Sequence, residues 1–299
     1  MKARSVACFL VLVTALLGCP AARPPSPGFR FTPVDEGVEY ARFFVAASGA
    51  RAAFDGHAFR VDLSRADLRM LSAGGPTTRR DVDTIVRALP RVVASNASFF
   101  AEDGRAMGLV VDQGTLRGRR RIKKWGALVV EGDRARVVEG SAVDLGARPT
   151  LVAQGQPRLV VDGRAAGLKP QSARRTVVCT TGASDARGHA SIVLIVTSDV
   201  DASALAAVLA ASESDGGLAC ADAINFDGGP STQLVARLGE VGVVVRGGDA
   251  VPNALAIIPG RSAAPLLDDA GPGAPVEEDG GAPLGAPAID DGGARVTRP

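Results

Sequence analysis

The chain has 299 residues, a formal net charge of +2 and 46% hydrophobic residues. This hydrophobic share is typical of a folded protein and excludes a disordered chain. A nearly balanced charge without a concentrated basic face gives no support to a nucleic-acid partner. Aromatic residues make up only 4% of the chain, so Val, Ala and Leu must fill the core and few rings remain for stacking on sugars.

The N-terminus has the pattern of an export signal. Lys2 and Arg4 precede an apolar run, residues 6–17, which is too short to cross a bilayer as a helix. The run ends in Leu-Leu-Gly-Cys, which resembles a bacterial lipobox, so we expect acylation of Cys19. An ordinary signal peptide cleaved nearby is the alternative. The expected location is the bacterial cell envelope, with a lipid anchor in a membrane that faces the periplasm or the exterior.

Composition divides the chain into four parts. We expect a lipoprotein signal peptide at 1–18, a Pro-rich tether at 19–30, one folded domain at 31–261 and a disordered acidic Gly/Pro/Ala tail at 262–299.

Strand patterns dominate the expected domain. Short apolar or alternating runs bounded by Gly, Ser or Asp predict strands at 38–46, 59–63, 68–71, 92–96, 106–112, 125–131, 136–139, 158–162, 176–181, 191–197, 223–227, 232–237, 241–246 and 254–258. Apolar residues with a helical period predict helices at 78–89 and 203–212, the second capped by Ser203. Many strands and few helices predict an α+β fold, a single domain of mixed or antiparallel β-sheets. A doubly wound fold is excluded because it needs a helix after nearly every strand.

A basic cluster lies at 117–124, where six of eight residues are Arg or Lys. A solvated hairpin loop is the favoured interpretation. A patch that attracts anionic phosphate substrates or membrane lipids is the alternative.

Four cysteines occur in the chain. Cys8 lies in the signal segment and Cys19 in the lipobox, which leaves Cys179 and Cys220. In an oxidising compartment this isolated pair is a candidate disulfide, and two free buried thiols are the alternative.

The segment 223–231 reads Ala-Ile-Asn-Phe-Asp-Gly-Gly-Pro-Ser. A buried strand here ends in a carboxylate, and the two glycines that follow allow a backbone to approach a ligand closely. Alternation along the strand would place Asn225 and Asp227 on the face opposite to Ile224 and Phe226. Taken alone, Asp-Gly-Gly is more often a plain turn.

Three other polar positions could join this turn. Asn96 follows an apolar strand and is flanked by small residues. Arg174 and Arg175 begin another strand, and a guanidinium is a favoured partner of phosphate. Asn253 precedes the last expected strand.

The order of these motifs resembles the phosphodiester glycosidase family over roughly residues 55–260. Family members typically show Asn-Gly-Gly-Phe-Phe, then Arg-Thr, then Leu-Asp-Gly-Gly-Gly-Ser. The corresponding stretches here begin at Asn96, Arg175 and Phe226. The chain departs from the family at Ala97, Ser98 and Pro230, each of which replaces a glycine. This added bulk predicts a narrower substrate range, or else an envelope lipoprotein that binds glycan or phosphoglycan without turnover.

The resemblance implies hydrolysis of a sugar-1-phosphodiester by an exported enzyme acting on a glycan or glycoconjugate. Asp227 would be nucleophile, base or hydroxyl anchor, Arg174 or Arg175 would hold the phosphate, and Asn96 would bond the sugar or the phosphate. Substrate-binding positions would be Gly228, Gly229, Ser231, Asn225 and Asn253.

No cofactor is implied, although a Ca²⁺ or Mg²⁺ ion at Asp227 is an open alternative because oxygen ligands are available. The only histidines, His57 and His189, have no nucleophile beside them in sequence, so neither a Ser/His/Asp triad nor a His-rich zinc site is supported.

Overall fold

The computed structural model describes residues 26–49, 51–261 and 277–278. The expected signal peptide, Cys19 and most of the expected tail lie outside the described residues. None of the helices in the described part is long and apolar enough to cross a membrane.

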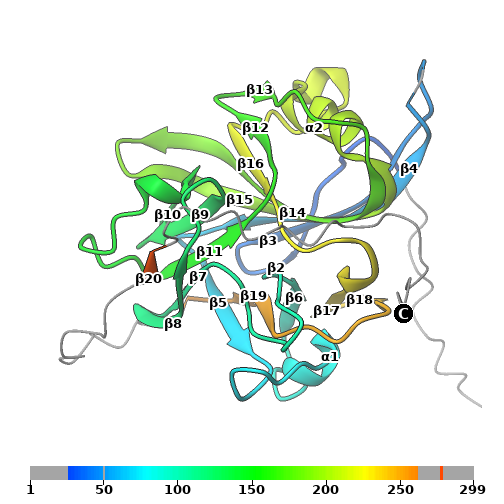
Figure 1. Cartoon of the computed structure of the whole chain (residues 1–299). Helices are drawn as coiled ribbons and strands as arrows, with labels where there is room; N and C mark the ends of the chain where they lie inside the picture. Colours follow the sequence, from blue (N-terminus) through cyan, green and yellow to red (C-terminus); the bar gives the residue numbers. More distant parts are fainter. Residues whose placement is uncertain (1–25, 50, 262–276, 279–299) are drawn as a thin grey trace, which may run out of the picture.

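Fifteen of the described strands form one large sheet (Figure 1). Neighbouring strands are antiparallel, except that β1 pairs with β3 and β20 pairs with β8 in parallel. The strands are β1 Ser26–Pro27, β2 Thr32–Asp35, β3 Val38–Val45, β4 Phe54–Asp62, β7 Leu109–Asp112, β8 Thr115–Arg121, β9 Gly126–Glu131, β10 Arg134–Glu139, β11 Leu151–Gly155, β12 Arg158–Val161, β13 Arg164–Ala165, β14 Ser172–Asp185, β15 Gly188–Asp201, β16 Asp222–Asn225 and β20 Glu277–Glu278.

A second, five-stranded antiparallel sheet has the order β18-β17-β6-β19-β5. Its strands are β5 Ala66–Ser72, β6 Val92–Asn96, β17 Leu234–Leu238, β18 Val241–Val245 and β19 Asn253–Pro259. The helices are α1 Val82–Ile85 and α2 Ala202–Ala210, with 3-10 turns η1 Gly140–Ala142, η2 Glu213–Asp215 and η3 Gly229–Ser231.

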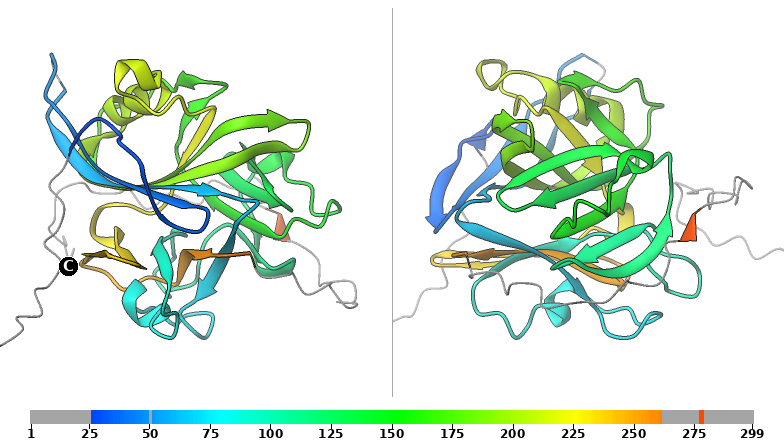
Figure 2. Two further views of the ribbon diagram at one scale, coloured as in Figure 1. Left: turned by 180° about the vertical axis from the view of Figure 1, so that it is seen from behind. Right: turned by 90° about the vertical axis from the view of Figure 1, so that its left-hand side faces the viewer.

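The elements stack in layers (Figure 2). The main core lies between the two sheets and includes Phe59, Leu194 and Phe226 of the large sheet side with Leu255 of the small sheet. A second core packs α2 on the other face of the large sheet, and a third packs α1 on the other face of the small sheet. Strand alternation explains this arrangement, because successive side chains enter opposite layers.

The prediction of antiparallel sheets with few helices is confirmed, but the fold is mostly β rather than evenly α+β. The helix expected at 78–89 was wrong in length. Arg80 pairs instead with Val251 in a β-bridge, and only Val82–Ile85 is α-helical. The cap of α2 was also wrong, because Asp201 accepts the hydrogen bonds of Ser203 N and Ala204 N.

Three segments differ from their expected loops. Residues 26 and 27, placed in the tether by the sequence, pair with β3, and the ring of Phe29 packs on Phe43. Most of the basic cluster is strand β8 rather than a solvated loop. Residues 277–278 of the expected tail run alongside β8.

A disulfide joins Cys179 of β14 to Cys220, with their Cα atoms 5.7 Å apart. Both residues are buried in the core beneath α2. The structure therefore contains the candidate pair rather than two free thiols.

Candidate active site

Asp227 lies where the large sheet meets the small one. It follows Phe226, whose ring is fully buried between the sheets. The backbone N–H of Asp227 donates to the Ala97 carbonyl at 3.0 Å. Its carbonyl accepts from Asn96 Nδ2 at 2.7 Å. These two hydrogen bonds clamp the Asp227 backbone to the end of β6.

The turn after Asp227 requires both of its glycines. A Cβ on Gly228 would lie 2.8 Å from the Arg174 carbonyl oxygen, and Gly229 has a φ of +55°. The space beside Gly229 is open. Pro230 fits because it enters η3 in the first turn, where no N–H is needed. Its ring is exposed, and its carbonyl accepts from Gly248 N and Asp249 N.

The carboxyl of Asp227 is electrostatically unusual. Burial raises the pKa of Asp227 to about 6, and the negative charge of Asp249 adds to this effect. Hydrogen bonds from the Ser231 hydroxyl and from Gly228 N, the latter at 3.0 Å, act in the opposite direction. No Arg or Lys of the described chain forms an ion pair with Asp227. Near neutral pH the group can therefore exchange a proton, which suits acid–base or nucleophilic chemistry.

Asn96 is fully buried and acts within the protein. Its Oδ1 accepts from Thr176 Oγ1 at 2.7 Å and from Gln233 N at 3.0 Å, while its Nδ2 holds Asp227. Because both ends of the amide are used, Asn96 ties three chain segments together beneath the carboxylate.

The two candidate arginines point to different places. Arg174 donates from Nη1 to the Arg246 carbonyl at 3.0 Å and from Nη2 to the Thr232 carbonyl at 2.8 Å. It therefore lies over the loop that follows Asp227 and still has other N–H donors. Arg175 is buried, and its guanidinium donates to the Gln171 carbonyl. The structure brings Arg174 to the turn, whereas Arg175 is held on the segment before β14.

The remaining predicted binding residues are mostly used internally. Asn225 Nδ2 donates to the Gln156 carbonyl at 3.0 Å, and its buried Oδ1 has no hydrogen-bond partner among the described residues. Ser231 is buried against the Asp227 carboxyl. Asn253 binds both the N–H and the hydroxyl of Ser98, each at 3.0 Å.

The described residues contain neither a cluster of metal-binding side chains nor a histidine suited to catalysis beside Asp227. No three His, Cys, Asp or Glu side chains of that part gather so as to hold a metal ion. The His57 ring hydrogen-bonds to the Tyr40 hydroxyl at 2.8 Å, and burial lowers the pKa of His57 to about 4. The His57 ring is therefore neutral near pH 7.

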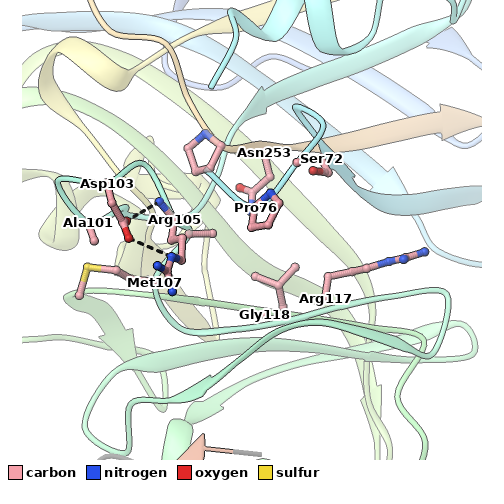
Figure 3. A pocket seen from close by; sticks show the side chains of 13 residues that line it. Ser72, Pro76, Ala101, Asp103, Arg105, Met107, Arg117, Gly118 and Asn253 are labelled. Atoms are coloured by element: carbon pink, nitrogen blue, oxygen red, sulfur yellow. Dashed lines mark hydrogen bonds and ion pairs between the residues drawn. The ribbon is translucent and has the colours of Figure 1, made fainter. Parts of the chain in front are cut away.

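A pocket of about 490 Å³ has one predicted site residue, Asn253, in its lining (Figure 3). It lies between the end of β5, the loop after β6, the beginning of β8 and the beginning of β19. Its lining residues are Ser72, Gly75, Pro76, Ala101, Asp103, Arg105, Ala106, Met107, Val110, Arg117, Gly118, Pro252 and Asn253.

Sequence reasoning missed several members of the site. Thr176 and Gln233 hold Asn96, and Asp249 acts on the charge of Asp227. The Gly-Gly-Asp at 247–249, shortly before Asn253, was the available signal for a second carboxylate. Thr176 belongs to the Arg-Thr motif, but its role in holding Asn96 had no signal in the sequence. Gln233 had no signal at all, because it lies in an ordinary strand pattern.

A family model described as phosphodiester glycosidase matches residues 90–258, more than half of the chain. The matched region contains Asn96, Arg174, Asp227 and Asn253. Comparison with curated proteins gave no match.

Several solved structures are similar to this chain, and two of them follow. The first is the catalytic domain of zebrafish N-acetylglucosamine-1-phosphodiester alpha-N-acetylglucosaminidase, auto-inhibited by its pro-peptide. Its TM-score is 0.57 and its identity 18%, over 80% of this chain and 87% of that one. The second is a hypothetical protein from Synechocystis, with a TM-score of 0.50 and 17% identity over 80% and 64% of the two chains.

Proposed function

The chain belongs to the phosphodiester glycosidase family, and from this premise we propose that it is an exported hydrolase that cleaves a sugar-1-phosphodiester of a glycan or glycoconjugate. The observation that carries the proposal is Asp227. Its half-buried carboxyl, with a pKa of about 6, is held where the two sheets meet, next to an open turn.

In the proposed reaction, the bond between the anomeric carbon and the phosphate oxygen breaks, and the oxygen of water is added to that carbon. The phosphate leaves as a phosphomonoester, so little general-acid help is needed compared with ordinary glycoside hydrolysis. Ionised Asp227 either takes the proton of the attacking water or attacks the carbon itself before water releases the sugar.

Arg174 is the proposed phosphate ligand. Two carbonyl hydrogen bonds fix its guanidinium beside the turn, and its remaining N–H groups can donate to phosphate oxygens. Gly229 lies against open space, where its N–H can approach the same group. Asn96 serves this reaction by positioning Asp227 rather than by contacting substrate.

The departures from the family motif are accommodated by packing. Ala97 and Ser98 are buried and have ordinary negative φ angles, and Ser98 is held by Asn253. They add no backbone strain at the site. Nothing in their geometry favours a protein that binds without turnover over an enzyme.

The test is Asp227→Asn on a panel of chromogenic or UDP-linked sugar-1-phosphodiesters. We expect kcat/KM to fall by at least about 100-fold, because the variant has no carboxylate. The exposed Asp199→Asn is the matched control and should keep full activity. An unchanged rate for Asp227→Asn would overturn the site, and binding without turnover by the unmodified protein would favour a glycan-binding lipoprotein.

The stability of Asp227→Asn shows whether a loss of its activity comes from unfolding. The folded-state pKa of Asp227 is raised, so its ionisation destabilises the fold as pH rises from about 4 to about 6. Asp227→Asn keeps an acceptor for Gly228 N and has no charge to bury. We therefore expect it to be at least as stable as the unmodified protein at pH 7, by thermal denaturation.

We also propose that Cys19 carries a lipid that anchors the protein in the cell envelope. The support is the Leu-Leu-Gly-Cys sequence after a short apolar run. Cys19→Ala should move the protein from the membrane to the soluble fraction. Full membrane retention of this variant would contradict the anchor.

A further inference from the structure

The pocket in Figure 3, which we call the arginine pocket, has Asn253 of the small sheet in its lining. Asn253 at the start of β19 pairs with Ser72 at the end of β5, and Ala254 pairs with Asn96 at the end of β6. Neighbouring strands lie about 4.8 Å apart, so the pocket begins about one to two strands, roughly 5–10 Å, from the clamp on Asp227. One extended substrate can reach both.

Asn253 forms a wall shared by the pocket and the active site. Its side chain lines the pocket and holds Ser98 through two hydrogen bonds. Ser98 follows Ala97, whose carbonyl accepts from Asp227 N. A ligand that contacts Asn253 is therefore connected to Asp227 through the short segment Ala97–Ser98.

The charged residues that line the pocket are two arginines and one aspartate, so positive charge is in excess. Asp103 is paired with Arg105 at 2.8 Å. Arg117 lines another side of the pocket, is exposed, and forms no ion pair with any other described residue. Apart from Asn253, the remaining walls are apolar or small, among them Pro76, Met107 and Val110. No ring lines the described walls, so stacking on a sugar is not what this pocket offers.

We propose that the arginine pocket binds an anionic group, phosphate or carboxylate, that the substrate carries in addition to its reacting phosphodiester. This inference rests on the proposed function, because the group must belong to the molecule that Asp227 cleaves. A volume of about 490 Å³ admits such a group with several attached carbons. Arg117 would pair with the anion, and the apolar walls would cover the carbons.

The first experiment compares substrates that share one sugar-1-phosphodiester. One has a neutral sugar and aglycone, one has a carboxylate or phosphate on the aglycone, and one has a carboxylate on the sugar. We expect one charged substrate to have a KM about tenfold lower than the neutral one, and which one it is identifies the half of the substrate in the pocket. Arg117→Gln should abolish the preference.

Arg164→Gln is the matched control, because Arg164 is an exposed arginine of β13. It should keep the preference of the unmodified protein. Equal KM values for all three substrates, or a preference that survives in Arg117→Gln, would overturn the proposal.

A binding measurement separates this proposal from the proposed reaction. Trp125, the single tryptophan, packs edge-on against Phe99, with the centroids of the two rings 5.2 Å apart. The Phe99 carbonyl in turn accepts from Met107 N of the pocket wall. Glycerol 3-phosphate should therefore change Trp125 fluorescence, and calorimetry should give the same dissociation constant.

The two failures then look different. Binding that is intact in Asp227→Asn and about tenfold weaker in Arg117→Gln supports the pocket even if no substrate is turned over. Binding that is equal in Arg117→Gln and the unmodified protein, or undetectable in both, overturns the pocket and leaves the role of Asp227 untouched.

Discussion

The carboxyl of Asp227 is subject to opposing influences within a few ångströms. Burial and Asp249 favour the protonated form, whereas Ser231 and Gly228 N favour the ionised form. The balance leaves a pKa of about 6, close to the working range of an acid–base group. The influences of Ser231 and Asp249 each come from one side chain that can be changed alone.

We predict that two substitutions move the pH profile in opposite directions. In the proposed mechanism Asp227 acts ionised, so kcat/KM should rise with pH through about 6. Ser231→Ala removes a hydrogen bond to the carboxylate, which raises its pKa and moves this rise to higher pH. Asp249→Asn removes a negative charge, which lowers that pKa and moves the rise to lower pH, by about half a unit or more.

The measurement is kcat/KM against pH on a substrate without other titrating groups. The Asp249→Asn shift should shrink in high salt, because Asp249 is exposed and its field is screened. Shifts in the same direction, or none, would contradict this description of Asp227.

The sequence indicated which residues gather at the candidate site but could not assign a role to each of them. Asp227, Asn96 and Asn253 converge as their order suggests. The choice between Arg174 and Arg175 was beyond the sequence, since adjacent strand residues point to opposite faces and the facing layer was unknown. Asn96 was expected to touch substrate, but only the fold shows that its amide is already used.

At the scale of elements, strands with a clear alternation of apolar and polar residues were predictable. Elements whose bounds depend on contacts with distant parts of the chain were not. Strand β6 has the expected bounds. The helical period at 78–89 was real, but Arg80 bonds to the Val251 strand segment and to the Ala73 carbonyl, which removes the first turn from the helix. Strand β8 was missed because its arginines hide the strand pattern.

The Cys179–Cys220 disulfide fastens β14 to the chain entering β16, the strand that leads to Asp227. The bond closes a loop with a sequence separation of 41. In the chain-entropy model this constraint contributes about 4 kcal/mol. We predict that the Cys179→Ala/Cys220→Ala double variant loses about 2–4 kcal/mol of unfolding free energy in urea.

Reduction of the unmodified protein with a strong thiol should lower the urea midpoint to a similar extent. Because both cysteines are buried, the double variant also loses some packing, so it should not be the more stable of the two. A double variant with unchanged stability would show that the bond constrains little.

At the scale of the whole molecule, the site depends on two sheets that keep a fixed relation. The sequence indicated strands but not their division between sheets, because pairing across long sequence separations leaves no local pattern. Asp227 belongs to the end of the large sheet and its clamp to the small one. Any slip between the sheets would therefore open the clamp.

An ion pair between a partly exposed arginine and a buried aspartate also links the two sheets. Arg69 of β5 donates from Nε and Nη2 to both oxygens of Asp112 in β7, each at 2.9 Å, and Met70 N donates to the same carboxylate. Removing one partner leaves a poorly solvated charge or donor. We predict that Asp112→Ala costs about 3 kcal/mol of unfolding free energy.

The Arg69→Met/Asp112→Ala double variant should recover part of that loss, because the lone charge is gone and a thioether fills the space. Every variant should still unfold in one transition by fluorescence and circular dichroism, since the shared core joins the sheets. Additive losses would show that the pair is not coupled. Two separate transitions would show that the sheets unfold independently. In that case neither the ion pair nor the shared core would fix the position of Asp227 relative to the small sheet.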